Sequence, residues 1–336
     1  MSFDTPIMSR RGLNRAAFSS TRGVRLRSLR HLGVGFMTLT LLLSTPACRD
    51  DTPRPPVLPG VAEPPCQLKQ EAFAISQLNL PGSSTELRDT AFDLDLDGRP
   101  DYGIASFRLA LSSQLSAPVA SDWRNHIDAA LADGRATWIL VAEVCADGSS
   151  DHARVGLYRA TDADGDGVFE MVRNGQVPAV GQRDAIGHIL ATEGTGTAPI
   201  VTLFDPLGRA QDAGWVSGSA LSVELGPVIS DGTRVVRLGL ALEHGALDRV
   251  VPPLAGFLTE DASSAPGLAR LLDSNTDGAV SEEEFRTNVV MKAMLADDVD
   301  VLADYEGKTV YWPSRDDQND SSSLSLVGLA RRVEIE

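Results

Sequence analysis

The 336-residue sequence has few basic residues, few aromatic residues and few cysteines, and each shortage narrows the functions open to it. Thirty Lys and Arg face 46 Asp and Glu, a formal net charge of −16. That charge disfavours nucleic acids and anionic membrane surfaces as partners, because their phosphates would be repelled. Aromatic residues make up 5% of the chain, so platforms for stacking sugars or bases are scarce. Three cysteines without a Cys-x-x-Cys pair argue against a structural zinc site.

The sequence motifs of common enzyme classes are also missing. There is no Gly-x-Ser-x-Gly, no Walker loop, no Gly-x-Gly-x-x-Gly and no His-Glu-x-x-His. The histidines at positions 126, 152, 188 and 244 stand singly, which favours structural or solvent-facing roles. A pair of carboxylates could serve a glycoside hydrolase, but so acidic a chain does not single out one pair. An enzymatic role is therefore less favoured than a binding role.

The first 47 residues have the pattern of an export signal. Seven arginines and one acid precede or flank an apolar stretch over residues 32–43, which is shorter than the roughly 20 residues of a membrane-spanning helix. Ala47 followed by Cys48 resembles the lipobox of bacterial lipoproteins, and this resemblance implies that Cys48 is lipidated and becomes the mature N-terminus. Cleavage there would leave 23 basic and 45 acidic residues, a net charge of −22. Plain secretion and a buried apolar element are the alternatives.

Residues 48–65 look like a tether between this anchor and a folded domain. Six prolines in residues 49–65 favour an extended, polyproline-like conformation. Arg49 favours the outer membrane or cell surface by the sorting rule of lipoprotein families. If Cys48 carries a lipid, Cys66 and Cys145 remain as an even pair in an oxidising compartment, and we expect a disulfide between them. Two separate buried thiols are the alternative.

Residues 273–284, the third of three Asp-rich loops along the chain, place oxygen-bearing groups at the spacing that calcium loops use. The expected ligands stand at positions 1, 3, 5, 7, 9 and 12, and they are Asp273, Asn275, Asp277, Ala279 through its carbonyl, Ser281 and Glu284. Gly278 at position 6 permits the sharp turn. With helical apolar patterns on both sides, residues 262–296 resemble the EF-hand family, which implies Ca2+ binding. A degenerate loop kept for packing is the alternative.

Two earlier loops repeat the first half of that pattern. The expected side-chain ligands are Asp93, Asp95, Asp97 and Asp101 in the first loop and Asp162, Asp164, Asp166 and Glu170 in the second loop. The first loop has Ile104 at its twelfth position, so it resembles the shortened loops of dockerin-type modules and must take its remaining oxygens from elsewhere. A strand ending in an Asp-Gly turn is the alternative for the first loop, and a hydrated hairpin turn for the second.

Apolar alternation predicts a strand-rich domain over residues 66–255. Strand patterns cover residues 136–144, 153–159, 186–192, 199–204, 221–225 and 233–243. A helix capped by Ser121 is expected to end at Gly134. Residues 256–336 should hold the EF-hand segment and a last strand over 324–333. We therefore expect an α+β fold: a β-rich, sandwich-like domain with an EF-hand helix–loop–helix near the C-terminus.

The order of these features also resembles that of myxobacterial-type extracellular lipoproteins of unknown function. The resemblance implies calcium binding and a surface location, and it implies no reaction. We expect an exported calcium-binding protein, anchored to the outer membrane or cell surface by its lipid, with a structural or interaction role. Calcium and the membrane are the expected partners and nucleic acid is not; a protein or glycan partner stays open. The alternative is a secreted, calcium-stabilised hydrolase whose active site is not recognised.

Overall fold

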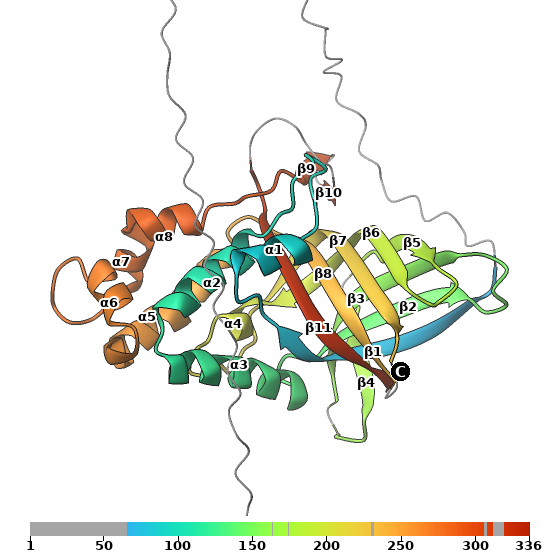
Figure 1. Ribbon diagram of the computed structural model, residues 1–336, viewed down its shortest axis with the longest axis horizontal. Helices are drawn as coiled ribbons and strands as arrows, with labels where there is room; N and C mark the ends of the chain where they lie inside the picture. The colour runs from blue at the N-terminus through green and yellow to red at the C-terminus, as the bar shows by residue number, and fades with distance from the viewer. Residues whose placement is uncertain (1–65, 163, 174, 230–231, 306–307, 312–318) are drawn as a thin grey trace, which may run out of the picture. The chain divides into compact units, whose positions relative to one another are not determined.

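The protein folds as a closed barrel of eight antiparallel strands (Figure 1). The computed structural model describes residues 66–336 apart from 163, 174, 230–231, 306–307 and 312–318. Each strand hydrogen-bonds to the next around the ring, in the order β1 (Leu68–Asn79), β2 (Trp138–Cys145), β3 (His152–Thr161), β5 (Ala179–Arg183), β6 (Ile189–Pro199), β7 (Trp215–Val228), β8 (Thr233–Leu242) and β11 (Ser322–Ile335). Pairing of β11 with β1, with Ala72 opposite Val333, closes the ring.

The interior of the barrel is filled with apolar side chains. Because side chains alternate along a strand, Val236, Leu238, Leu240 and Leu242 of β8 all belong to the main core and are at most 2% exposed. Each such side chain contributes about 1.5–3 kcal/mol when it is fully buried. Two cavities bordering this core hold about 10 Å³ each, which is room for one water molecule.

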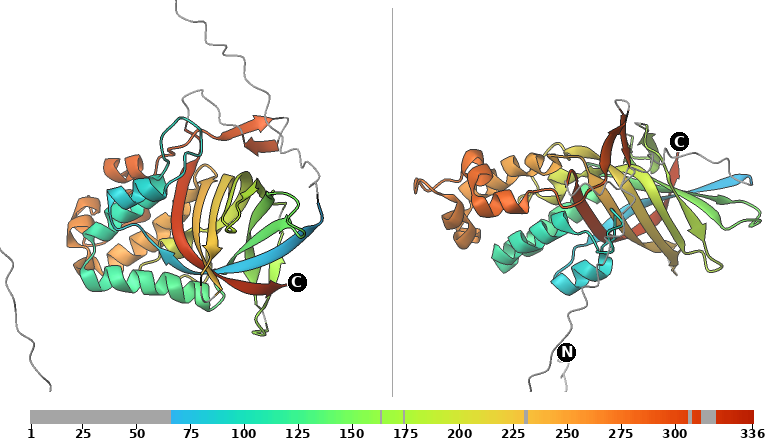
Figure 2. Two further views of the ribbon diagram at one scale, coloured as in Figure 1. Left: turned by 45° about the vertical axis from the view of Figure 1, so that its right-hand side comes forward. Right: turned by 90° about the horizontal axis from the view of Figure 1, so that it is seen from above.

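The helices gather on one side of the barrel (Figures 1 and 2). They are α1 (Ser84–Thr90), α2 (Gly103–Gln114), α3 (Ala117–Ala132), α4 (Ile200–Leu203), α5 (Val251–Glu260), α6 (Pro266–Leu272), α7 (Glu282–Thr287) and α8 (Val289–Met294), with 3-10 turns at Ala246–Val250 and Ala262–Ser264. Trp123 and Ile127 of α3 are fully buried and join the core of the barrel. Among the described residues, no helix is long and apolar enough to cross a membrane.

Four barrel strands also take part in a second ring. Strand β4 (Val168–Val172) pairs with the end of β3 and, in parallel, with the end of β11, so that β1, β2, β3, β4 and β11 form a closed set of five strands. All five supply residues to a separate apolar cluster, which includes Ala74, Ile139, Tyr158, Phe169 and Val333. A small hairpin of β9 (Leu302–Tyr305) and β10 (Lys308–Tyr311) stands apart from this sheet.

The expected α+β, sandwich-like fold is wrong, because the sheet closes on itself. Alternation predicted β2, β3, β7, β8 and β11 but did not reveal β1, whose pairing with β11 completes the barrel. The expected EF-hand helix–loop–helix is wrong as well: α6 has seven residues and α7 has six, and both belong to the helical layer.

Two local predictions need smaller corrections. The strand expected over residues 199–204 is absent there: β6 ends at Pro199, and residues 200–203 form the short helix α4. Helix α3 starts after Ser116 and not after Ser121, because Pro118 in its first turn suits a helix start.

Candidate metal sites

All three Asp-rich loops adopt the same hydrogen-bonded turn. The carboxylate at position 1 accepts the backbone N–H of the glycine at position 6, over 3.0 Å from Gly98 to Asp93, 3.2 Å from Gly167 to Asp162 and 3.0 Å from Gly278 to Asp273. These glycines have φ values of +91°, +86° and +86°. An added β-carbon would meet no atom of the described residues within 4 Å, so glycine is required here by the left-handed backbone and not by crowding.

Two further turns in each loop direct the side chains at positions 3 and 5. The side chain at position 3 accepts the N–H of residue 5, over 3.0, 3.4 and 2.8 Å in the first, second and third loops. The carboxylate at position 5 accepts the N–H of residue 7, over 2.7, 2.8 and 2.9 Å. These hydrogen bonds hold the side chains at alternate positions on the inside of each turn, where the oxygen ligands of a hard cation are needed.

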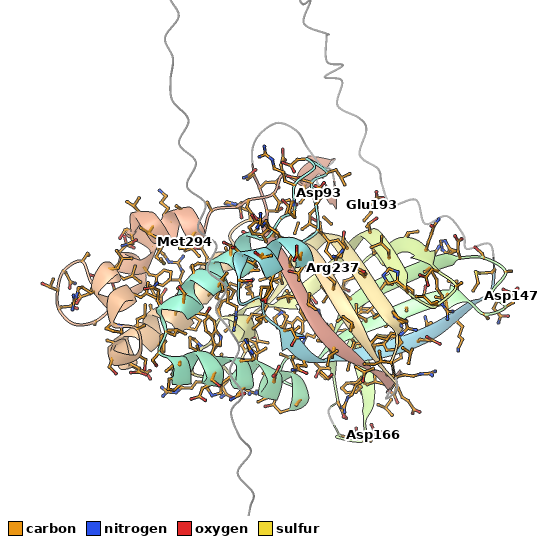
Figure 3. The ribbon with its side chains drawn as sticks, viewed as in Figure 1. Asp93, Asp147, Asp166, Glu193, Arg237 and Met294 are labelled. Atoms are coloured by element: carbon orange, nitrogen blue, oxygen red, sulfur yellow. A yellow bond between two sulfur atoms is a disulfide. The ribbon has the colours of Figure 1, made fainter. Side chains whose placement is uncertain are left out.

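The three loops lie in separate parts of the structure. Figure 3 shows Asp93 and Asp166 at opposite edges of the barrel, and Figure 1 shows the third loop between α6 and α7. Each loop therefore has to be judged as a site by itself.

The first and second loops each bring three carboxylates together. In each group, every residue offers an oxygen within 4.8 Å of the other two, and the groups are Asp93, Asp95 and Asp101, and Asp162, Asp164 and Asp166. Such acidic groups could hold a metal ion. Asp97 and Glu170 are expected ligands that lie outside these groups; Glu170 stands exposed on β4, opposite Thr161.

The first loop is seated on the outer face of the barrel by apolar side chains. Phe92 and Leu94 pack in one cluster with Ala220 of β7, Ala241 of β8 and two valines of the segment after α8. A β-carbon on Gly239 of β8 would lie 2.6 Å from the Phe92 ring, so the absence of a side chain there allows the loop to approach. Leu94 stands between Asp93 and Asp95 and packs against the barrel, in a loop and not in the strand that was the alternative interpretation.

Asp101 is the acid of the first loop whose pKa is shifted most. Its side chain is 8% exposed, and Oδ2 accepts the Leu94 N–H over 2.6 Å. Burial, together with the nearby charges of Asp95, Asp298 and Asp93, raises the pKa of Asp101 to about 7 despite that hydrogen bond. In addition, Oδ1 of Asp93 is buried and has no hydrogen-bond partner among the described residues. A cation at this loop would relieve both conditions.

Residues 298–300 approach the first loop from far along the chain. Asp298 accepts hydrogen bonds from the N–H of Gly103 over 2.7 Å and from the N–H and Oγ of Ser323 over 2.7 and 2.5 Å, and burial raises its pKa. The N–H of Asp300 donates to Asp95. Sequence reasoning placed no site residue here, although the acidic run 297–300 was the available signal.

The second loop is the turn between β3 and β4, as its hairpin interpretation predicted. Asp164 and Asp166 are exposed and Asp162 is half-buried, whereas in the first loop Asp101 is buried and Asp93 and Asp95 are half-buried. The turn is held by its own hydrogen bonds, including the 2.8 Å bond from the Gly165 N–H to Asp162.

In the third loop, Glu284 closes the loop through hydrogen bonds. Its Oε1 accepts from the N–H and Oγ of Ser274 and the N–H of Asn275, over 2.9, 3.0 and 3.2 Å. Its Oε2 accepts from the N–H and Oγ of Ser281, over 3.0 and 2.9 Å. The bonds from Ser281, followed by those from Asn275 and Ser274, lower the pKa of Glu284 to about 2. Within the described chain, Asp273, Asp277 and Glu284 do not form a group of converging carboxylates.

The third loop packs against helix α5. Val280, at position 8, is 3% exposed, and its N–H and C=O both bond to the Thr259 hydroxyl of α5 over 3.1 Å. The loop is thus fixed to α5 by two hydrogen bonds between the Val280 backbone and the Thr259 side chain.

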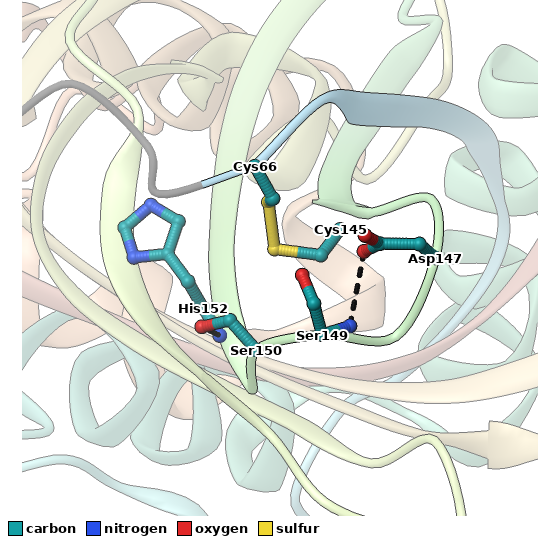
Figure 4. The surroundings of a disulfide bond; sticks show 6 residues. All are labelled: Cys66, Cys145, Asp147, Ser149, Ser150 and His152. Carbon is teal, nitrogen blue, oxygen red and sulfur yellow. Dashed lines mark hydrogen bonds between the residues drawn. A yellow bond between two sulfur atoms is a disulfide. The ribbon is translucent and has the colours of Figure 1, made fainter.

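The Cys66–Cys145 disulfide is present, as predicted (Figure 4). The two Cα atoms are 5.6 Å apart, and the bond joins the start of the described chain to the end of β2. Lipidation at Cys48, the signal at 1–47 and the tether at 48–65 fall outside the described residues.

Comparison of the chain with protein families, with curated proteins and with solved structures finds no match. The loops therefore have to be interpreted from their own geometry.

Proposed function

We propose that this protein binds calcium at its first loop and serves a structural or interaction role as a lipid-anchored protein of the cell surface. The observation that carries the calcium proposal is the enclosed group of Asp93, Asp95 and Asp101. Three carboxylates with mutually close oxygens repel one another, and one of them is buried enough to have a pKa of about 7. A divalent hard cation with oxygen ligands compensates for that repulsion best.

The geometry also suggests where the missing oxygens come from. The first loop lacks a ligand at Ile104, which is buried in the main core. Asp298 lies close enough for its charge to raise the pKa of Asp101. We therefore include Asp298 as the candidate that completes the coordination shell. The second and third loops are weaker candidates: the second is more exposed, and the carboxylates of the third do not converge among the described residues.

Export is supported by the disulfide, because such bonds persist in oxidising compartments. The hydrolase alternative gains no comparable support. The three acids with raised pKa values at the first loop, Asp95, Asp101 and Asp298, all accept hydrogen bonds from backbone N–H groups. The two cavities described above have room for one water each.

Calorimetric titration of chelator-treated protein tests the calcium proposal. Wild type should bind Ca2+ with a Kd of about 10⁻⁴–10⁻³ M, the range of extracellular modules. The double variant Asp93→Asn, Asp95→Asn should lose that binding. Asp147→Asn is the matched control, because Asp147 forms the same kind of turn with Ser149, over 3.0 Å, at an exposed position away from the three loops (Figure 3). Unchanged calcium binding in the double variant would contradict the assignment.

Lipid anchoring is tested separately by the intact mass of the protein in the membrane fraction. We expect loss of residues 1–47 and addition of a lipid at Cys48. A Cys48→Ser variant should leave that fraction. A wild-type protein that keeps its arginine-rich leader would rule out the anchor while leaving the calcium proposal untouched.

A further inference from the structure

Short turns join the barrel strands at the end opposite to the helical connections. The helices lie in the connections β1–β2, β6–β7 and β8–β11, which leave the strands at one end (Figure 1). Because neighbouring strands are antiparallel, the short β2–β3, β5–β6 and β7–β8 connections lie at the other end, which we call the turn end. Cys66 lies there too, because its disulfide joins it to Cys145 at the end of β2.

The turn end presents apolar side chains to solvent. In the β5–β6 turn, the Asp184 carboxylate accepts the N–H of Ile186 over 3.0 Å and that of His188 over 2.9 Å, which fixes the turn and leaves Ile186 72% exposed. Ile229, the residue after β7, donates its N–H to the Thr233 carbonyl over 2.9 Å and is also exposed. Six of the ten exposed large apolar side chains among the described residues belong to β5–β8 and their turns: Val180, Ile186, Leu190, Val228, Ile229 and Val235.

Arg234 of β8 closes the barrel beneath these turns. Its Nη1 donates to the Gly187 carbonyl over 2.9 Å and to the Gly226 carbonyl over 3.0 Å, which joins the β5–β6 turn to the end of β7. Its guanidinium carbon lies 4.9 Å from the centre of the Phe73 ring, a residue of the barrel core. The side chain of Arg234 is 3% exposed. A barrel end filled in this way suits a flat partner better than a small molecule bound inside.

Basic residues gather at the turn end although the chain as a whole is acidic. Glu71 of β1 accepts a hydrogen bond from Lys69 over 3.0 Å and lies 3.7 Å from Nη2 of Arg234. Burial raises its pKa, but the Lys69 hydrogen bond and the charges of Lys69, Arg234 and Arg332 outweigh burial and lower it. Arg183, the last residue of β5, lies close enough for its charge to act on Arg234. Four cations thus lie around one acid, in a chain of net charge −16.

We propose that the turn end of the barrel rests on the surface of a phospholipid bilayer. Ile186 and Ile229 enter the headgroup region, and the exposed Lys69 and Arg332 contact the lipid phosphates. Apolar and basic side chains act together in this way at membrane surfaces. The inference rests on the membrane location proposed above and assigns the part of the protein that meets the bilayer.

The start of the described chain supports this orientation. Cys66 is held at the turn end by its disulfide, and the predicted tether of residues 48–65 joins the domain there. A lipid at Cys48 would therefore bring this end of the barrel to the bilayer before the helices. The β2–β3 turn carries Asp147 and Asp151, so its negative charge places it outside the proposed contact.

A fluorescent probe on Ile186→Cys in the lipidated protein tests the proposal. The protein is placed in vesicles of phosphatidylethanolamine and phosphatidylglycerol that contain a spin-labelled phospholipid as quencher. The probe at position 186 should be quenched. A probe on Val289→Cys, which replaces an exposed valine of α8, should not be. Equal quenching at the two positions, or no quenching at 186, would overturn the proposal. Self-association that shields position 186 from the quencher would assign the surface to a second copy and would also overturn it.

Vesicle binding without the lipid separates this contact from the anchor. The Cys48→Ser chain without its leader should sediment weakly with the same vesicles. Lys69→Gln and Arg332→Gln should each weaken that binding about fivefold, the contribution of one basic side chain near an anionic surface. Arg270→Gln, which removes an exposed arginine from α6, should not weaken it. Equal binding of all three variants, or no binding of the parent chain, would overturn the contact whether or not Cys48 carries a lipid.

Discussion

Replacing Asp101 by asparagine should change the stability of the protein in opposite directions with and without calcium. Asparagine has nearly the same shape, and its Oδ1 can still accept the Leu94 N–H that Asp101 accepts over 2.6 Å. It carries no charge, so the metal-free protein no longer buries a carboxylate near Asp93, Asp95 and Asp298. It is also a weaker ligand, so the variant should gain less from calcium.

The size of the effect follows from the pKa of Asp101, which is about 7 in the native state against an ordinary value of 3.8 in an unfolded chain. As pH rises from about 4 to 7, the unfolded chain releases this proton while the native state retains it, so metal-free stability falls across that window. A shift of about 3 pKa units corresponds to about 4 kcal/mol. The loop borders solvent, and screening reduces the penalty to about 1–2 kcal/mol. The variant should therefore melt about 2–6 °C higher than wild type at pH 8 without calcium.

Thermal melts at pH 4 and pH 8, each with chelator or with calcium, provide the assay. The advantage of Asp101→Asn should appear at pH 8 with chelator, disappear at pH 4, and be reversed by calcium at pH 8. Asp147→Asn should show no such advantage, because hydrogen bonds from Ser149 lower the pKa of its exposed carboxyl. A variant that melts at or below wild type at pH 8 without calcium would refute the argument that burial strains Asp101.

Two further substitutions test the third loop and the packing of the first loop against β8. Glu284→Gln should remove an acid-sensitive contribution to stability, because the native pKa of Glu284 is about 2 against an ordinary value of 4.5. Wild type keeps this contribution above pH 4.5 and loses it as the pH falls towards 2, while the glutamine of the variant does not titrate. Melts from pH 2 to 6 check this against the exposed control Glu283→Gln, and equal acid sensitivity in both variants would disprove it. In Gly239→Ala, which changes none of the expected calcium ligands, the new β-carbon would lie 2.6 Å from Phe92 and 3.1 Å from Leu94. This clash should weaken calcium binding and should destabilise the fold by about 1–3 kcal/mol. Calorimetry and melts check this against Gly256→Ala, where no atom of the described residues lies within 4 Å of the new β-carbon. Equal calcium affinities of Gly239→Ala and Gly256→Ala would show that Gly239 does not position the loop.

The features that the sequence predicted are those written in short stretches of chain. Large apolar residues alternate along β8 because one face of the strand packs in the core. The spacing of Asp and Gly predicts the turns of the three loops. The disulfide followed from the even pair of cysteines that the expected lipidation of Cys48 leaves.

The features that escaped prediction depend on contacts between distant segments. Strand β1 does not alternate in its middle, because Ala72, Phe73, Ala74 and Ile75 are all buried, two against the barrel core and two against the five-strand cluster. A strand covered on both faces has no period of two, and without β1 the closure of the barrel could not be inferred. The role of Asp298 was hidden for the same reason, since its bond to Gly103 joins residues 195 positions apart.

The position of β11 in two rings determines the order in which the chain can fold. This strand hydrogen-bonds to β1, β4 and β8, and it is the last strand along the described chain, so neither ring can close before it has been synthesised. Pairing between strands so distant in sequence is slow, because a long loop must be closed first. The disulfide needs only the chain through β2 and can form well before that step. If the chain is exported, as we propose, its barrel cannot close until the final strand has followed.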